Sequence, residues 1–243
     1  MIEQYTAPRT NRRRIVAVLT ALAVGSGVSA CQPENQPVSP EAPASTNGNT
    51  ISFSTAQAVH DLGSLAIKGR APMTGYGREK FSNGWASVDG CDTRDIILKR
   101  DLTQITLATD GCEVRSGRLQ DPYTGSQIDF VHGVKTSSAV QIDHDVSVGD
   151  AWQTGAQLLE PSERKSFYND PLNLLAVDGR ANEQKGDGDA ASWLPANKGE
   201  HCRYIARQIL VKLKYGLWVT PPEHDAMNGV LSTCQNQTLS IAD

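Results

Sequence analysis

The sequence of 243 residues lacks a long hydrophobic run, a CxxC motif and an internal repeat. Its longest apolar stretch, residues 15–30, is shorter than the roughly 20 residues that a membrane-spanning helix needs. No cysteine pair has the CxxC spacing that is typical of structural zinc sites. We therefore expect one folded domain, without a spanning helix and without a zinc module built from cysteines.

Basic residues are also few. Lysine and arginine number 23, against 27 aspartates and glutamates. Removal of the first 30 residues takes away four basic residues and one acidic residue, which leaves 19 and 26 and a formal charge of −7. This balance argues against a broad basic surface that coats DNA without specificity.

The first 30 residues have the pattern of an export signal. A positive segment, Asn11-Arg12-Arg13-Arg14, precedes an apolar run from Ile15 to Val24. Val28-Ser29-Ala30-Cys31 resembles the lipobox of bacterial lipoproteins, in which the cysteine is lipidated and becomes the mature N-terminus. We expect an exported bacterial lipoprotein, anchored through Cys31 to the extracytoplasmic face of the membrane. The alternative is a secreted protein that is cut near Ala30 and keeps Cys31 as a free thiol.

Composition then divides the mature chain into two parts. Residues 31–50 are rich in Pro, Ser, Asn, Glu and Ala, and they are predicted to form a disordered tether. Residues 51–243 are long enough for one domain with a proper core.

The four remaining cysteines favour two disulfides in an exported chain, and three pairings are open. We favour Cys91–Cys112 and Cys202–Cys234. The second pair follows from a predicted helical hairpin, because the start of its first helix lies beside the end of its second.

Apolar periodicity and turn residues predict an α+β domain with an embedded ββα element and a C-terminal helical hairpin. The expected helices cover residues 55–67, 93–102, 150–159, 203–215 and 221–231, and another begins at 181. The expected strands cover residues 105–107, 112–119, 128–131, 140–142 and 174–177.

An adjacent carboxylate and imidazole, Asp143 and His144, end one of these strands. Neighbouring side chains on an extended segment point to opposite faces, so one can bind a metal while the other approaches the substrate. We predict that Asp143 is a metal ligand and that His144 is the general base, since an imidazole with a pKa of about 6.5 suits deprotonation of water. Asn182 offers a second oxygen ligand, and such ligands suit Mg²⁺ or Mn²⁺. Asn173 is grouped with the catalytic residues because it is expected to hold the His144 loop.

The order of His144, Asn173 and Asn182 around a strand, a turn and a helix resembles the active site of HNH nucleases. Longer stretches are similar to exported bacterial HNH-family proteins and to the C-terminal nuclease domain of GmrSD-type, modification-dependent restriction enzymes. These stretches are residues 68–72, 121–125, 142–144, 169–179, 182 with 185–191, and 214–220. The resemblance implies a metal-dependent endonuclease fold, with the same roles for Asp143, His144, Asn173 and Asn182.

One feature departs from this family. Such proteins continue after the Asp-His pair with apolar residues, whereas Asp145 follows here. A second carboxylate beside His144 is expected to raise the pKa of the imidazole. Lys185, Arg203 and Arg207 are the predicted contacts to substrate phosphates.

Three functions follow from these patterns. The first is a lipid-anchored endonuclease that cuts DNA, or RNA, by metal-dependent phosphodiester hydrolysis; the acidic charge does not exclude it, because a metal and a few local cations suffice. The second is a catalytically idle lipoprotein that binds nucleic acid or an envelope partner. The third is a hydrolase of another phosphodiester. No base-reading motif, dimer interface or obligate protein partner is evident in the sequence.

Overall fold

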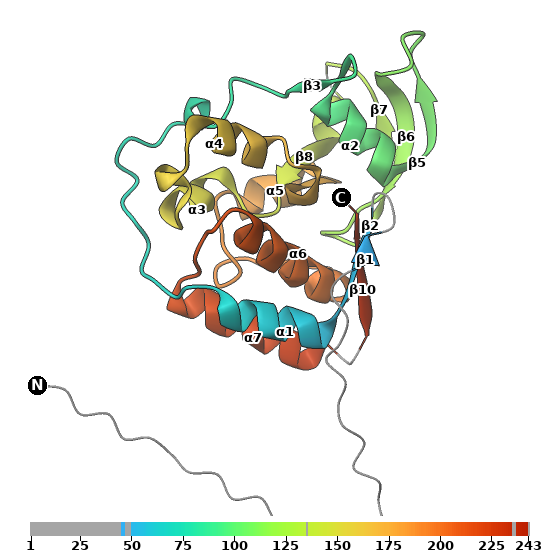
Figure 1. Ribbon diagram of the computed structural model, residues 1–243. Helices are drawn as coiled ribbons and strands as arrows, with labels where there is room; N and C mark the ends of the chain where they lie inside the picture. The colour runs from blue at the N-terminus through green and yellow to red at the C-terminus, as the bar shows by residue number, and fades with distance from the viewer. Residues whose placement is uncertain (1–44, 47–49, 135, 235–236, 243) are drawn as a thin grey trace, which may run out of the picture. The chain divides into compact units, whose positions relative to one another are not determined.

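Two strands, β8 (Val140–His144) and β9 (Leu174–Asp178), pair antiparallel, and helix α5 (Gly179–Lys185) follows β9 directly (Figure 1). The computed structural model describes residues 45–46, 50–134, 136–234 and 237–242. These residues all lie in one unit, Glu41–Asp243. Because α5 contacts both strands, the three elements form the predicted ββα unit.

The elements before this unit are β1 (Ser45–Thr46), β2 (Thr50–Ser54), α1 (Thr55–Ser64), β3 (Ser87–Val88), β4 (Cys91–Asp92), α2 (Thr93–Asp101), β5 (Leu102–Leu107), β6 (Val114–Gln120) and β7 (Gln127–Val131). Between β8 and β9 lie α3 (Val148–Gln153) and α4 (Pro161–Tyr168). After α5 come α6 (His201–Lys214), α7 (Pro221–Thr233) and β10 (Thr238–Ala242). The mixture of helices with small antiparallel sheets confirms the α+β class.

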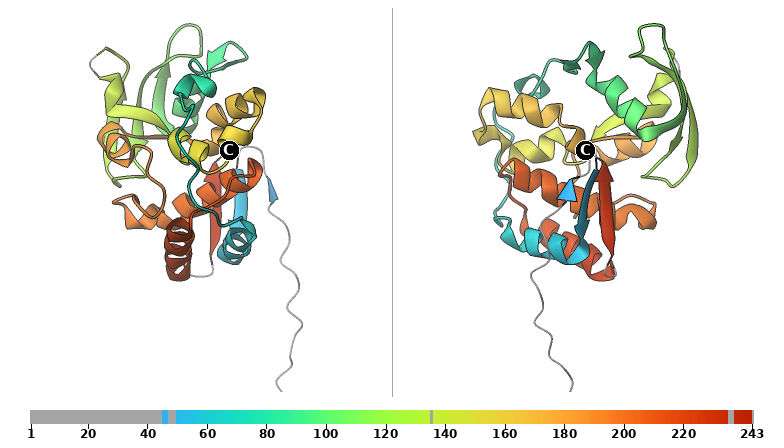
Figure 2. Two further views of the ribbon diagram at one scale, coloured as in Figure 1. Left: turned by 90° about the vertical axis from the view of Figure 1, so that its left-hand side faces the viewer. Right: turned by 45° about the vertical axis from the view of Figure 1, so that its right-hand side comes forward.

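The β8–β9 pair contributes to two hydrophobic cores. Alternate residues, Val140 and Ile142 on β8 with Leu174 and Ala176 on β9, enter a core shared with α2 and the sheet β5–β6–β7. Figures 1 and 2 show α2 against one face of that sheet. Val177 enters the second core, which contains side chains of α1, α3, α4, α6 and α7. Burial on both sides fixes the register of these strands, since a one-residue slip would exchange their faces.

Both predicted disulfides are present. Cys91 is bonded to Cys112 with a Cα–Cα distance of 5.1 Å, and Cys202 is bonded to Cys234 with a Cα–Cα distance of 5.9 Å. Cys202 lies in the first turn of α6 and Cys234 follows the last residue of α7. The second bond therefore joins the two ends of the helical hairpin that were expected to meet.

Three predictions about the elements are wrong. The single helix expected over residues 150–159 is interrupted, because Gly155 has a φ of +130°, which no helical residue adopts. Pro161 was expected to end that helix, but it occupies the first turn of a separate helix, α4, where its missing N–H costs nothing. The sheet β1–β2–β10 was not predicted. Its residues Ser45, Thr46 and Thr50 fall inside the expected tether, the rest of which lies outside the described residues.

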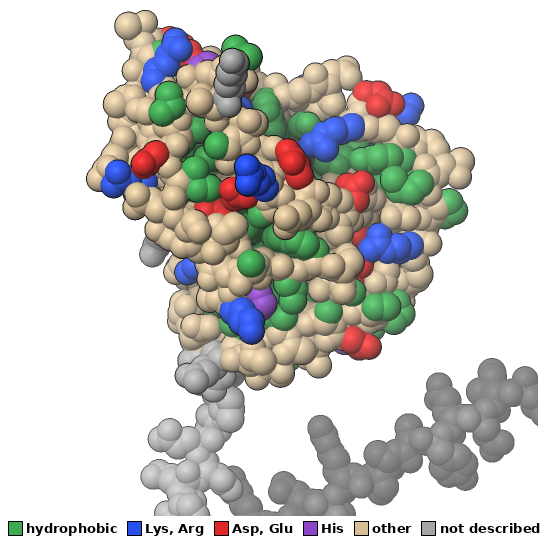
Figure 3. Space-filling model, turned by 180° about the vertical axis from the view of Figure 1, so that it is seen from behind, with side chains coloured by type: hydrophobic (Ala, Val, Ile, Leu, Met, Phe, Trp, Pro, Cys, Tyr) green, Lys and Arg blue, Asp and Glu red, His purple; other side chains and the backbone are tan. Residues whose placement is uncertain are grey.

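The surface carries mixed charge. On the face drawn in Figure 3, basic side chains are scattered among acidic ones and do not gather into one patch. Among the helices of the described segments, none combines the length and the apolar character that crossing a bilayer would take.

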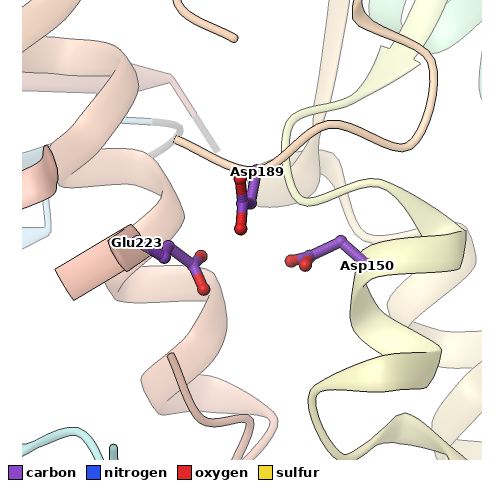
Figure 4. Close-up of side chains that lie close together, drawn as sticks. All are labelled: Asp150, Asp189 and Glu223. Carbon is purple, nitrogen blue, oxygen red and sulfur yellow. The ribbon is translucent and has the colours of Figure 1, made fainter. Parts of the chain in front are cut away.

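Buried charges connect α3, α6 and α7. The ammonium of Lys212 lies 2.9 Å from Oδ2 of Asp150 and 2.8 Å from Oε1 of Glu223. Arg70 contacts Asp189 at 2.6 Å and Asp150 at 3.6 Å. Figure 4 shows the three carboxylates converging from α3, α7 and the loop after α5. Burial raises the pKa of Glu223 to about 7, although the charge of Lys212 lowers it. The helices can pack here only while the cations balance the carboxylates.

Replacement of Lys212 by methionine should lower the free energy of unfolding by about 3–5 kcal/mol, because it leaves Asp150 and Glu223 buried without their cation. The loss should be larger at pH 8 than at pH 5. Because burial raises its pKa to about 7, Glu223 binds more protons in the folded state than in the unfolded chain, so its stabilising effect declines as pH rises.

Urea denaturation of Lys212→Met measures this loss. The control is Lys165→Met, at an exposed lysine of α4, which should change the free energy of unfolding by no more than about 0.5 kcal/mol. Equal stability of the two variants would contradict the assignment.

Candidate active site

The ββα unit borders a cavity of about 220 Å³. Strand β8 contributes Asp143 and His144, and helix α5 contributes Asn182, so three predicted site residues line one space. The other lining residues are Arg78, Gln141, Ile142, Ser147, Val148, Glu183, Gly186 and Asp187. A larger opening of about 700 Å³ lies beside α2 and is lined by none of the predicted catalytic or metal-binding residues. The smaller cavity is therefore the candidate active site.

The ring of His144 is fixed in one orientation and one tautomer. Its Nε2 lies 2.8 Å from the backbone oxygen of Tyr168. A carbonyl oxygen only accepts, so Nε2 carries the proton and Nδ1 keeps its lone pair. Nδ1 has no hydrogen-bond partner in the described part of the chain. The rings of Trp85 and Phe167 stack on the imidazole, with centroids at 5.7 and 6.3 Å and interplanar angles of 16° and 13°.

The pKa of His144 is lowered to about 3, first by burial and then by the nearby charge of Arg78. The imidazole is therefore neutral at physiological pH and can accept a proton at Nδ1. A pKa of about 3 also makes it a weaker base than an imidazole that titrates near neutral pH.

The expected effect of Asp145 on His144 is wrong. The carboxylate of Asp145 is fully buried and faces Arg207, with Oδ2 3.8 Å from the guanidinium Nε. Asp145 lies in the bend that follows β8, and this bend turns its side chain into the core toward Arg207. Desolvation raises the pKa of Asp145 to about 8, and both of its oxygens are without a hydrogen bond in the part of the chain described. Asp145 belongs to the core behind the site.

Asp143 is held by two buried donors. The Tyr123 hydroxyl donates to Oδ2, and the Lys185 ammonium lies 2.9 Å from Oδ2 and 3.1 Å from Oδ1. Lys185 also donates to the backbone oxygen of His144 at 2.7 Å. Its side chain is completely buried, so in this structure Lys185 positions Asp143 in place of the predicted phosphate contact. The register of α5 turns residue 185 inward toward β8.

The two other predicted phosphate contacts also lie away from the cavity. Arg203 pairs with Glu200 on the surface of α6. Arg207 is buried and donates to the backbone oxygens of Leu172 and Ala242 at 2.7 and 2.9 Å. Arg203 and Arg207 are one helical turn apart, but Arg207 lies on the buried face of α6 and enters the core.

The two asparagines have different surroundings. Asn173 is fully buried; its Oδ1 accepts from the Val146 amide at 2.9 Å and its Nδ2 donates to the Val146 oxygen at 3.2 Å. These bonds hold the chain that leaves His144, as expected. Asn182 lines the cavity, and its Nδ2 donates to Oε1 of Gln141 at 2.9 Å. That bond orients the amide and leaves Oδ1 without a partner among the described residues.

These donors fit a divalent cation that prefers oxygen. A carboxylate has about four acceptor positions, and Tyr123 and Lys185 use three of those on Asp143. One position remains there, and Asn182 supplies its free Oδ1. In the described segments, the one group of at least three acidic, histidine or cysteine ligands is Asp150, Asp189 and Glu223. That group pairs with Lys212 and Arg70 and does not line the cavity, whereas Asp143, which pairs with Lys185, does.

Sequence analysis missed four residues of the site, which are Arg78, Trp85, Tyr123 and Tyr168. Tyr123 lies in a stretch, residues 121–125, that already resembled the family, so a signal for it existed. Arg78 and Trp85 lie some 60 residues before His144, in a loop with no strand or helix pattern, and only the fold brings them to the cavity and the imidazole.

Replacement of Asp145 by asparagine should change how stability depends on pH. With a pKa of about 8 in the folded state and about 3.9 in the unfolded chain, Asp145 stabilises the fold most at low pH. This stabilisation is lost as pH rises through about 8. Since asparagine cannot ionise, the Tm of the variant minus that of the wild type should rise between pH 5 and pH 9. A difference that stays constant or falls would show that Asp145 is ionised throughout.

Comparisons with known proteins identify the family of the chain. The family model described as the C-terminal domain of GmrSD restriction endonucleases matches residues 92–230, more than half of the chain. An uncharacterized secreted protein of Arthroderma benhamiae is 38% identical over 197 residues, which cover 79% of this chain and 91% of the relative. No solved structure matches. The chain belongs to the family of GmrSD restriction endonuclease C-terminal domains.

Proposed function

We propose that the protein is a metal-dependent endonuclease that hydrolyses phosphodiester bonds of nucleic acid, with DNA as its main substrate. One observation carries the proposal. In a chain of an endonuclease family, a neutral imidazole with its Nδ1 free lines the same cavity as a carboxylate and an amide oxygen. This combination supplies a base for water and ligands for a metal at one place.

In the proposed mechanism, Nδ1 of His144 takes a proton from the water that attacks phosphorus. The bond from Nε2 to the Tyr168 oxygen keeps the ring in place and stabilises the cation formed. Asp143 and Asn182 would hold Mg²⁺ or Mn²⁺, which when bound would stabilise charge on the phosphate and on the leaving oxygen. Lys185 and Tyr123 keep Asp143 aimed at the cavity, and Asn173 holds the loop after His144.

The idle binding protein is the second candidate. The acidic mature charge and the mixed charge in Figure 3 favour its envelope-partner form, because they offer little attraction to nucleic acid. The endonuclease family supports catalysis instead, together with the unpartnered Nδ1 of His144 and the cavity shared with Asp143 and Asn182.

Replacement of His144 by alanine should lower the rate of plasmid cleavage by about 10²–10⁴-fold, the typical effect of losing a positioned general base. Asp143→Ala and Asn182→Ala should lose activity that higher Mg²⁺ partly restores, because they weaken metal binding. The protein used is residues 51–243, with EDTA as a negative control.

The matched control is His60→Ala. The side chain of His60, on α1, is 78% exposed, so this substitution should leave the cleavage rate unchanged. Equal nicking by His144→Ala and wild type, with equal circular dichroism spectra, would refute the assignment of His144 as the general base. Absence of nicking by the wild type with every divalent metal would favour the idle binding protein.

We also propose that the protein acts outside the cytoplasm and is held to a membrane by lipid on Cys31. Two disulfides suit an oxidising compartment, and the relative from Arthroderma benhamiae is a secreted protein. The proposed lipidation is based on the sequence Val28-Ser29-Ala30-Cys31, which lies outside the described residues.

Replacement of Cys31 by serine should move the protein from the membrane fraction to the soluble exported fraction, or block its processing, because serine cannot form the thioether. Fractionation and immunoblotting measure this. A variant that pellets with membranes as fully as the wild type would exclude lipidation at Cys31.

A further inference from the structure

Arg78 is the only basic side chain among the described residues that line the cavity. It shares the cavity with three acidic residues, Asp143, Glu183 and Asp187. A phosphodiester that enters this space meets negative charge on most sides, so its binding depends strongly on the few cations present. Arg78 is exposed and stands at the cavity.

Contacts with one aromatic residue orient the guanidinium of Arg78. Its Nε donates to the hydroxyl of Tyr168 at 3.2 Å, and its Cζ lies 5.3 Å from the centroid of that ring. In the described segments, no carboxylate oxygen lies within 4.0 Å of its nitrogens, and no hydrogen bond of its two terminal nitrogens is present. A guanidinium that is held at Nε and free at both terminal nitrogens can bind two phosphate oxygens at once.

Tyr168 links Arg78 to the base. Its hydroxyl accepts from Arg78, and its backbone oxygen accepts from Nε2 of His144. A phosphate held by Arg78 therefore has a fixed relation to the imidazole that would activate the attacking water.

We propose that Arg78 binds the scissile phosphodiester through its two terminal nitrogens and stabilises the charge that develops on the non-bridging oxygens. The proposal rests on the proposed function and adds to it the group that recognises the substrate. Because Arg78 binds a phosphate that every nucleotide carries, its contribution is the same for all sequences.

The first experiment measures binding without cleavage. His144→Ala protein in EDTA is titrated against a fluorescent DNA duplex at several salt concentrations, with and without Arg78→Ala. Loss of one phosphate contact should lower the magnitude of the slope of log K against log salt by about 0.9. Arg115→Ala is the matched control, because this half-exposed arginine of β6 pairs with Glu113 and does not line the cavity, so its slope should be unchanged.

The second experiment measures cleavage with Mg²⁺. Arg78→Ala should lower kcat/KM by on the order of 10²-fold, the usual effect of removing one donor to developing negative charge. Arg78→Lys should recover only part of this, since an ammonium cannot bind two oxygens in a fork. Millimolar guanidinium should rescue Arg78→Ala and should not affect Arg115→Ala.

The outcomes separate the two proposals. Cleavage by the wild type together with unchanged cleavage and salt slope in Arg78→Ala would overturn the role of Arg78 and leave the nuclease in place. Loss of cleavage with an unchanged slope and no rescue would also overturn it, because Arg78 would then act only through Tyr168. A wild type that binds duplex with the expected slope but never cleaves it would refute the proposed function while supporting Arg78 as a phosphate contact.

Discussion

The buried ion pair between Lys185 and Asp143 is the contact on which the site depends. Helix α5 has only seven residues, too few to be stable alone, so its position comes from tertiary contacts. The Lys185 ammonium provides one by lying on Asp143 and on the His144 oxygen of β8. Asn182 is three residues earlier on the same side of α5, and this anchor brings it to the cavity. Lys185 thus fixes the carboxylate of Asp143, the backbone at His144 and the position of Asn182.

The remaining parts of the site come from segments that are far apart in the chain. The loop before α2 supplies Arg78 and Trp85, the end of α4 supplies Tyr168, and the turn after β6 supplies Tyr123. Burial against the rings of Trp85 and Phe167 keeps the imidazole of His144 neutral, and the bond from Nε2 to the Tyr168 oxygen keeps it oriented. The acidic charge of the protein is compatible with the proposed nuclease, because Arg78 places one cation at the cavity and the proposed metal would supply a second.

Local patterns predicted what depends on nearby residues. Short apolar segments at residues 140–142 and 174–177 predicted the strands, and the Asp143-His144 pair together with Asn182 was placed at one site. The disulfides followed from the helical hairpin and from an even cysteine count. Partners distant in sequence could not be predicted in this way. Lys185 meets Asp143 across 42 residues, and Arg78 meets Tyr168 across 90. Pro161 was wrongly predicted to end a helix, because proline occurs both after the end of helices and in their first turn.

The state of His144 tests the account most directly. Long-range ¹H–¹⁵N correlation spectra of the imidazole report both the tautomer and the protonation of each ring nitrogen. The account predicts a neutral ring with the proton on Nε2 from pH 8 down to about pH 5, because the pKa is lowered to about 3. A ring that titrates near the ordinary value of about 6.5, or that carries its proton on Nδ1, would contradict it.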